Sequence, residues 1–252
     1  MIDHSKMKLG RYKSPHDPRT LKLWNYLIPH ELPPIPPVRD WTAGLSGFGQ
    51  MLNDQIGDCT CAGAAHSVQT MSATANPPML TIPDADILAA YEAITGYDPK
   101  DPSTDNGACL LDVLKYWRKH GIGDHKIAGF VQVSPQNIEH CQAAIELFGG
   151  LYSGAGLPIT AQSQEVWDVT PEGTSGRGAP YSWGGHCIWI PAFNPFKCIT
   201  WGLVKVITDA FASTYIDERW AVLTEDFINK ATAASPAGLK FQQLQDDLDA
   251  IQ

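Results

Sequence analysis

The most informative segment of this chain is Asn53-Asp54-Gln55-Ile56-Gly57-Asp58-Cys59-Thr60-Cys61-Ala62-Gly63-Ala64-Ala65-His66. A polar, glycine-containing turn leads into a cysteine, and the small residues that follow it predict a tightly packed helix. The N-terminus of a helix carries partial positive charge, which stabilises a thiolate. The stretch therefore indicates a nucleophilic cysteine at the start of a buried helix.

Three further features of this stretch bear on that chemistry. Asp58 is expected to cap the helix, which places Cys59 in its first turn. The side-chain amide of Gln55 or of Asn53 could donate an N–H to the oxyanion that forms when a thiolate attacks a carbonyl. Cys61 is a second candidate nucleophile, and the residues alone leave both cysteines open.

A thiol nucleophile needs an imidazole partner, and the sequence offers one much later. His186 follows Gly184-Gly185 and opens the apolar run Cys187-Ile188-Trp189-Ile190, which predicts a buried strand. The two glycines favour an open approach to the histidine at a cleft. His186 is therefore our candidate general base. His120, Asp124 and His125 are expected to belong to a surface loop rather than to a metal site.

Composition limits the class of protein. The chain has 252 residues, 44% of them hydrophobic and 18% charged, which is typical of a globular protein. The formal net charge of -9 argues against a nucleic-acid partner. No apolar run is long enough to span a bilayer, so no membrane partner is expected. The N-terminal residues lack the apolar segment of a secretory signal, which favours a cytoplasmic location and leaves virion association or release open.

The six cysteines are expected to be free thiols, because a chain of this size does not need disulfides. A bridge between Cys187 and Cys198 is the alternative, since these residues flank a predicted hairpin.

The order of elements predicts an α+β fold. Helices are expected from Cys59 to Ala73, from Pro83 to Gly96 and from Cys109 to His120. The second half is rich in strands, with one further helix that Ser134-Pro135 should begin and Gly149-Gly150 should end. The predicted strands cover 130–133, 151–158, 186–192, 196–201, 204–207 and 219–223. The tail from Pro236 to Gln252 predicts an amphipathic helix.

The first forty residues are set apart by their prolines. We expect residues 1–40 to form an arm that lies across the surface, and the alternative is an inhibitory pro-segment that occludes a cleft. The remaining chain, 41–252, is interpreted as one domain. Its helical lobe covers about 41–125 and its β-rich lobe about 126–252.

Several segments, in this order, resemble the papain-like cysteine peptidases, and Gly57-Asp58-Cys59-Thr60 is most similar to bacterial and phage versions. The resemblance implies a papain-like fold: a helical N-terminal lobe packed on an antiparallel β-sheet or barrel, with the active-site cleft between them. It also implies a thiol hydrolase that cleaves peptide or amide bonds in a peptide or protein substrate through an acyl-enzyme, without a cofactor. The segments are Pro37–Trp41, Asn53–Ala65, Gly107–Leu114, Gly185-His186 and Thr200-Trp201-Gly202.

The resemblance allows two registers at the nucleophile. With Cys59 as nucleophile, Asn53 occupies the place of the family's oxyanion glutamine. With Cys61, Gln55 has the spacing of the plant enzymes. The comparison with the family pattern favours Cys59.

The chain departs from the family at the third member of the site. Ile199 stands where the family has an asparagine, so Thr200 is expected to orient the His186 imidazole through its hydroxyl. Trp201 is expected to shield the His186 pair from water. Trp183 is expected to line the rim, with Gly185 in the substrate-binding surface.

Two other functions stay open at this point. The replacement by Ile199 favours a catalytically inactive papain-like module used for binding or structure. A Cys-His amidohydrolase that acts on bacterial cell wall is the other alternative. The sequence does not determine the oligomeric state.

Overall fold

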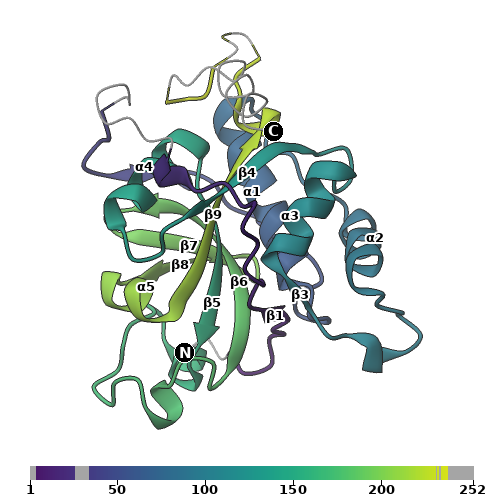
Figure 1. The fold of residues 1–252 in the computed structure, drawn as a ribbon, viewed down its shortest axis with the longest axis vertical. Coiled ribbons are helices and arrows are strands. Elements are labelled where there is room, and N and C mark those ends of the chain that lie inside the picture. Colours follow the sequence, from purple (N-terminus) through teal and green to yellow (C-terminus); the bar gives the residue numbers. More distant parts are fainter. Residues whose placement is uncertain (1–3, 26–33, 231, 233, 238–252) are drawn as a thin grey trace.

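The computed structural model describes residues 4–25, 34–230, 232 and 234–237, and these residues form a mixed α+β fold. Helices α1 (Cys59–Ala75), α2 (Asp84–Thr95) and α3 (Leu110–Lys119) gather on one side of the molecule, and a sheet forms the other (Figure 1). This division into a helical and a β-rich part confirms the predicted fold class.

The sheet is built from seven of the described strands. Their bounds are β2 Arg39–Asp40, β4 Ile127–Val133, β5 Leu151–Leu157, β6 Gly184–Phe193, β7 Phe196–Thr200, β8 Leu203–Ile207 and β9 Ile216–Thr224. Neighbouring strands follow the order β4-β9-β5-β6-β7-β8, and β2 pairs with β6. All of these pairs are antiparallel. The central position of β6 places His186 beside both β5 and the helical lobe.

Smaller elements complete the described chain. β1 (Arg11–Tyr12) and β3 (Ala108–Cys109) form a separate parallel pair. Helices α4 (Ile138–Phe148) and α5 (Asp209–Tyr215) belong to the β-rich half. The short 3-10 helices are η1 Leu23–Asn25, η2 Pro102–Thr104, η3 Ile159–Ser163, η4 Gly176–Gly178 and η5 Glu225–Phe227. None of the helices in the described residues is both long and apolar enough to cross a bilayer.

Helix α1 is buried along almost its whole length, because its small residues let both lobes approach it. A Cβ atom added at Gly63 would lie 2.9 Å from Cys187 Sγ and 3.2 Å from the Tyr152 ring. Trp189 Nε1 on β6 donates a hydrogen bond to Thr70 Oγ1 at 2.8 Å. These contacts hold α1 directly against the strand that carries His186.

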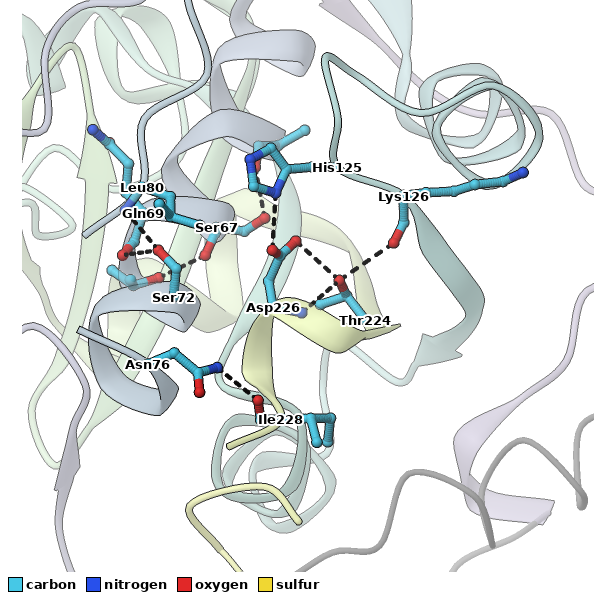
Figure 2. Close-up of polar contacts among 12 residues, drawn as sticks. Ser67, Gln69, Ser72, Asn76, Leu80, His125, Lys126, Thr224, Asp226 and Ile228 are labelled. Atoms are coloured by element: carbon cyan, nitrogen blue, oxygen red, sulfur yellow. Dashed lines mark hydrogen bonds and ion pairs between the residues drawn. The ribbon is translucent and has the colours of Figure 1, made fainter. Parts of the chain in front are cut away.

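A polar cluster fixes the end of β9 to α1 and to the loop before β4 (Figure 2). Asn76 Nδ2, just after α1, donates to the Ile228 carbonyl at 2.7 Å. His125 Nδ1 lies 2.8 Å from Asp226 Oδ1. His125 therefore has a structural partner across the lobes.

Two expectations for the β-rich half are wrong. The residue that caps α4 is Asn137, whose side-chain oxygen accepts a hydrogen bond from His140 N at 3.0 Å, and Ser134 lies in the turn before it. Helix α5 was not predicted, because its short length gives the hydrophobic periodicity too few turns to register. The predicted C-terminal helix lies outside the described residues from 238 onward.

All six cysteines are free thiols, so the alternative bridge between Cys187 and Cys198 is not formed.

The contact at Gly63 leads to a stability prediction. Gly63→Ala normally stabilises a helix by about 1 kcal/mol, because alanine has the higher helix propensity. Here the new methyl group would meet Cys187 Sγ and the Tyr152 ring. We expect a net loss of about 1–3 kcal/mol in the free energy of unfolding, measured by urea denaturation.

The double variant Gly63→Ala/Cys187→Ala is the matched control, because it removes the sulfur that the methyl group meets. It should recover part of the loss, as a coupling energy between the two sites. A stabilising Gly63→Ala would show that α1 is not pressed against β6.

Candidate active site

Cys59 is the first residue of α1, and its side chain is buried. Burial raises the pKa of its thiol to about 12, although backbone N–H groups of Cys187 and Gly10 that face the sulfur act in the opposite direction. Asp58 occupies the N-cap position and Cys59 begins the helix, as expected, but the Asp58 side chain accepts no capping hydrogen bond. Burial also raises the pKa of the Asp58 carboxyl, which favours its neutral form.

The His186 side chain, on β6, is buried against neighbouring side chains. Its Nε2 is 2.6 Å from Thr200 Oγ1 on β7, and the Trp201 ring stacks on the imidazole with centroids 4.4 Å apart. Burial lowers the pKa of His186 to about 3, and His66 and His4 lower it further, so the imidazole is neutral. The second ring nitrogen, Nδ1, is buried without a hydrogen-bond partner.

The structure thus brings Cys59 and the His186 strand together. The Cys59 sulfur faces the backbone N–H of Cys187, the residue next to His186. Because His186 Nδ1 has no partner, the thiol and the imidazole do not share a hydrogen bond in this closed arrangement. Both groups are neutral, and Nδ1 is the ring nitrogen that has no hydrogen-bond partner.

Cys61 has a different environment. It is buried in the same helix, and burial raises the pKa of its thiol well above the usual value, with the neighbouring Asp58 and Cys59 acting in the same sense. No group from β6 or from the N-terminal residues acts on it, unlike Cys59. The surroundings of the two thiols therefore differ.

The two amide candidates also differ. Asn53 is buried, and its Nδ2 donates to the Ile56 carbonyl at 3.2 Å. Gln55 is exposed. The structure therefore brings Asn53 to the buried turn before Cys59 and leaves the Gln55 side chain at the surface.

Residues 4–14, called here the N-terminal segment, lie between the two lobes and directly over Cys59. In Figure 1 the segment, dark purple, runs through β1 between β6 and the pair β3 and α3. Lys8 N donates to the Asn53 carbonyl at 3.3 Å, and Trp201 Nε1 donates to the Lys8 carbonyl at 3.3 Å. Ala108 N donates to the Gly10 carbonyl at 2.8 Å.

The N-terminal segment fits so closely that glycine is required on both sides. A Cβ at Gly10 would lie 1.7 Å from the Gly57 carbonyl oxygen. A Cβ at Gly107, which has φ +75°, would lie 1.9 Å from the Gly10 oxygen, and one at Gly185 would lie 1.9 Å from the Arg11 oxygen. Part of the arm thus lies inside the molecule instead of on its surface, and it excludes water from Cys59.

The remaining predicted residues surround the same place. Trp183 is partly buried, and its ring lies 5.6 Å from that of Trp201. Gly185 lies on β6 against the backbone of the N-terminal segment. Gly185, Trp183 and Trp201 therefore border the N-terminal segment that covers the Cys59 sulfur.

Sequence reasoning missed the residues that hold the N-terminal segment in place. The Arg11 guanidinium is fully buried and pairs with Asp217 at 2.8 Å and with Glu218. A signal for these residues was present, because two adjacent acids stand inside the apolar strand β9 and buried carboxylates need partners. Nothing in the local pattern identified Arg11 as the partner, more than two hundred residues away.

The buried imidazoles lead to a pH prediction. Burial lowers the pKa of His66 to about 4, while Gly49 O accepts its Nε2–H at 3.0 Å. A folded-state pKa below the unfolded value of about 6.5 means that the unfolded chain binds more protons as the pH falls. Stability is therefore full above pH 6.5 and decreases toward pH 4 for His66 and pH 3 for His186.

We expect His66→Gln to remove about 2 kcal/mol of the loss in unfolding free energy between pH 6.5 and 5. The measurement is urea unfolding at each pH, and His16→Gln, at an exposed position, is the control. Equal pH slopes for His66→Gln and the native chain would contradict the neutral buried imidazole.

Comparison with protein-family models and with curated protein sequences gives no match. Solved structures do match. Xylellain, a cysteine protease from Xylella fastidiosa, has a TM-score of 0.65 at 16% identity, covering 87% of this chain and 97% of xylellain.

ProCathepsin B S9 from Trypanosoma congolense has a TM-score of 0.59 at 10% identity, covering 89% of this chain and 88% of that one. Bromelain from Ananas comosus, in complex with the E64 inhibitor, has a TM-score of 0.51 at 12% identity and covers 75% and 99%. These structural neighbours are papain-like cysteine proteases, and the chain has the papain-like fold.

Proposed function

We propose that this protein is a cysteine peptidase-like thiol hydrolase that cleaves peptide or amide bonds, with Cys59 as nucleophile and His186 as general base. The observation that carries the proposal is that the N-terminal segment holds its extended backbone across the Cys59 sulfur, beside the strand of His186. A site that accommodates one extended peptide over a thiol has the shape that a peptide substrate requires.

The proposed reaction assigns a step to each of these groups. His186 Nδ1 takes the thiol proton, and the Cys59 sulfur attacks the substrate carbonyl carbon. The backbone N–H of Cys59 and the Asn53 amide stabilise the oxyanion. The protonated imidazole gives its proton to the leaving amine, and the acyl-enzyme remains. A water molecule, deprotonated by His186, then releases the acid and restores the thiol.

Thr200 and Trp201 support the imidazole in this scheme. The Thr200 hydroxyl is 2.6 Å from Nε2 and can accept a hydrogen bond from the imidazolium, which leaves Nδ1 directed to the thiol. A hydroxyl on β7 thus supplies the orientation for which the family uses an asparagine, here replaced by Ile199. The Trp201 ring covers the imidazole and excludes water from this bond.

The N-terminal segment is not itself cleaved in this proposal. Its Gly10 faces the Cys59 sulfur with an N–H, while the Gly10 carbonyl accepts a hydrogen bond from Ala108 N at 2.8 Å. A carbonyl held away from the nucleophile is not attacked. The N-terminal segment therefore acts as an inhibitor that must leave before a substrate can bind.

A catalytically inactive binding module is the second candidate. The neutral states of both Cys59 and His186 favour it, because catalysis needs a thiolate. Opening the site separates the two functions: water that replaces the N-terminal segment reduces the cost of charging the pair, and only a hydrolase then gains activity.

The test uses Gly10→Ala, whose methyl group would collide with the Gly57 carbonyl and displace the N-terminal segment. We expect this variant to hydrolyse casein or a mixed peptide library faster than the native chain. Cys59→Ala in the same background should lower the rate of hydrolysis about a thousandfold or more. Cys61→Ala should leave the rate unchanged.

Lys6→Ala, an exposed change in the same segment, is the control and should not activate the protein. Turnover of muropeptides without turnover of casein would instead support the cell-wall amidohydrolase. An inert Gly10→Ala whose Cys59 is shown to be accessible to iodoacetamide would contradict the hydrolase and support the binding module.

A further inference from the structure

The side chain of Arg11 fills a closed acidic pocket next to Cys59. The guanidinium is 0% exposed, and its Nη1 lies 2.8 Å from Asp217 Oδ1 and 2.7 Å from the Tyr181 hydroxyl. Its Nη2 donates to Glu218 Oε2. We call the site formed by Gly154, Tyr181, Asp217 and Glu218 the arginine pocket.

The walls of the arginine pocket are shaped for a planar cation. A Cβ at Gly154 would lie 2.5 Å from Arg11 Cζ, so the glycine provides the room for the guanidinium. Trp220 Nε1 donates to Glu218 Oε1 at 2.8 Å and fixes the carboxylate while its other oxygen faces the guanidinium. The pocket therefore depends on β5 and β9 and not only on the segment that fills it.

The strand register places the arginine pocket beside the reacting groups. Gly154 on β5 is opposite Glu218 on β9 and also opposite Cys187 on β6. The next residue of β5, Ala155, is opposite His186. Arg11 is also one residue from Gly10, whose N–H faces the Cys59 sulfur. A peptide over Cys59 therefore reaches this pocket with an adjacent side chain.

The two carboxylates of the arginine pocket favour a bound cation. Burial alone would lower the pKa of Arg11, but Glu218 and Asp217 raise it above its usual value. The Glu218 and Asp217 side chains are only 7% and 26% exposed. When the N-terminal segment leaves, these carboxylates lose the guanidinium that compensates for their burial, which is unfavourable until another cation enters.

We propose that the arginine pocket binds an arginine side chain of the peptide substrate, and that Arg11 occupies it as a substrate-like plug. This inference rests on the proposed hydrolase function. Arginine is favoured over lysine because its planar fork donates hydrogen bonds to Glu218 and to the Tyr181 hydroxyl while it forms an ion pair with Asp217. A leucine would leave both carboxylates without a cation, with only the Trp220 and Tyr181 hydrogen bonds to compensate for their burial.

Selectivity is measured in the Gly10→Ala background with three fluorogenic peptides that differ only in arginine, lysine or leucine at the residue that enters the pocket. We expect kcat/KM for the arginine peptide to exceed that for the leucine peptide at least about tenfold. Adding Glu218→Gln should reduce this ratio strongly, and adding Glu139→Gln, the same change at an exposed position of α4, should preserve it. Equal rates for arginine and leucine, or a ratio insensitive to Glu218→Gln, would overturn the inference.

A binding experiment on the full chain needs no turnover. Arg11→Ala empties the pocket, and millimolar methylguanidine should then raise the Tm of this variant. Methylguanidine should not raise the Tm of the native chain or of Arg11→Ala/Glu218→Gln, and methylammonium should act less strongly on Arg11→Ala. No stabilisation of Arg11→Ala by methylguanidine would count against a guanidinium site.

A failure of the pocket assignment and a failure of the proposed hydrolase function give different results. Cleavage of the peptides without preference for arginine overturns the pocket assignment and leaves the hydrolase intact. Rescue of Arg11→Ala by methylguanidine with no cleavage of any peptide overturns the hydrolase and leaves a guanidinium-binding pocket.

Discussion

The backbone of Gly10 packs directly against the backbone of Gly57, and this contact closes the site over Cys59. A Cβ atom at Gly10 would lie 1.7 Å from the Gly57 carbonyl oxygen, so the two backbones leave no room for a side chain between them. Gly57 stands two residues before Cys59, at the entry to α1. The close approach seals the sulfur from water, and both the chemistry of the closed state and the position of Arg11 follow from it.

The sealed state keeps the two candidate catalytic groups uncharged. Burial raises the pKa of Cys59 to about 12 and lowers that of His186 to about 3, so an ion pair does not form beneath the N-terminal segment. The segment compensates with an ion pair of its own, between Arg11 and the acids of β9. We propose that departure of the N-terminal segment breaks the Arg11 ion pair and lets Cys59 transfer its proton to His186. A substrate arginine then replaces Arg11 beside the acids of β9.

The sequence predicted the parts of this structure that depend on local pattern. The run of small residues after Cys59 is enough to specify a buried helix, and the apolar run after His186 is enough to specify a strand. The Thr200 hydroxyl, expected near the imidazole, lies 2.6 Å from it because β6 and β7 are adjacent strands. The order of these elements gave the α+β fold class.

Local sequence patterns could not predict the contacts between segments that are far apart in the chain. Gly10, Gly107, Gly154 and Gly185 come from four separate segments, and each looks like an ordinary loop or strand glycine until the N-terminal segment lies among them. Similarly, Gln55 and Asn53 are equally polar in sequence, and only the turn before α1 decides that Asn53 is buried. The expected surface arm gave no sign of Arg11 in the interior, because its acidic partners belong to the last strand of the sheet.

Whether the N-terminal segment closes the site can be measured as the rate of Cys59 alkylation by iodoacetamide at different pH values, followed at that residue by mass spectrometry. In the native chain we expect slow alkylation at neutral pH, because the thiol ionises only toward pH 12. In Gly10→Ala we expect fast alkylation at neutral pH, because the opened thiol can transfer its proton to His186. Identical pH profiles in the two proteins would contradict the claim that the N-terminal segment holds the site closed.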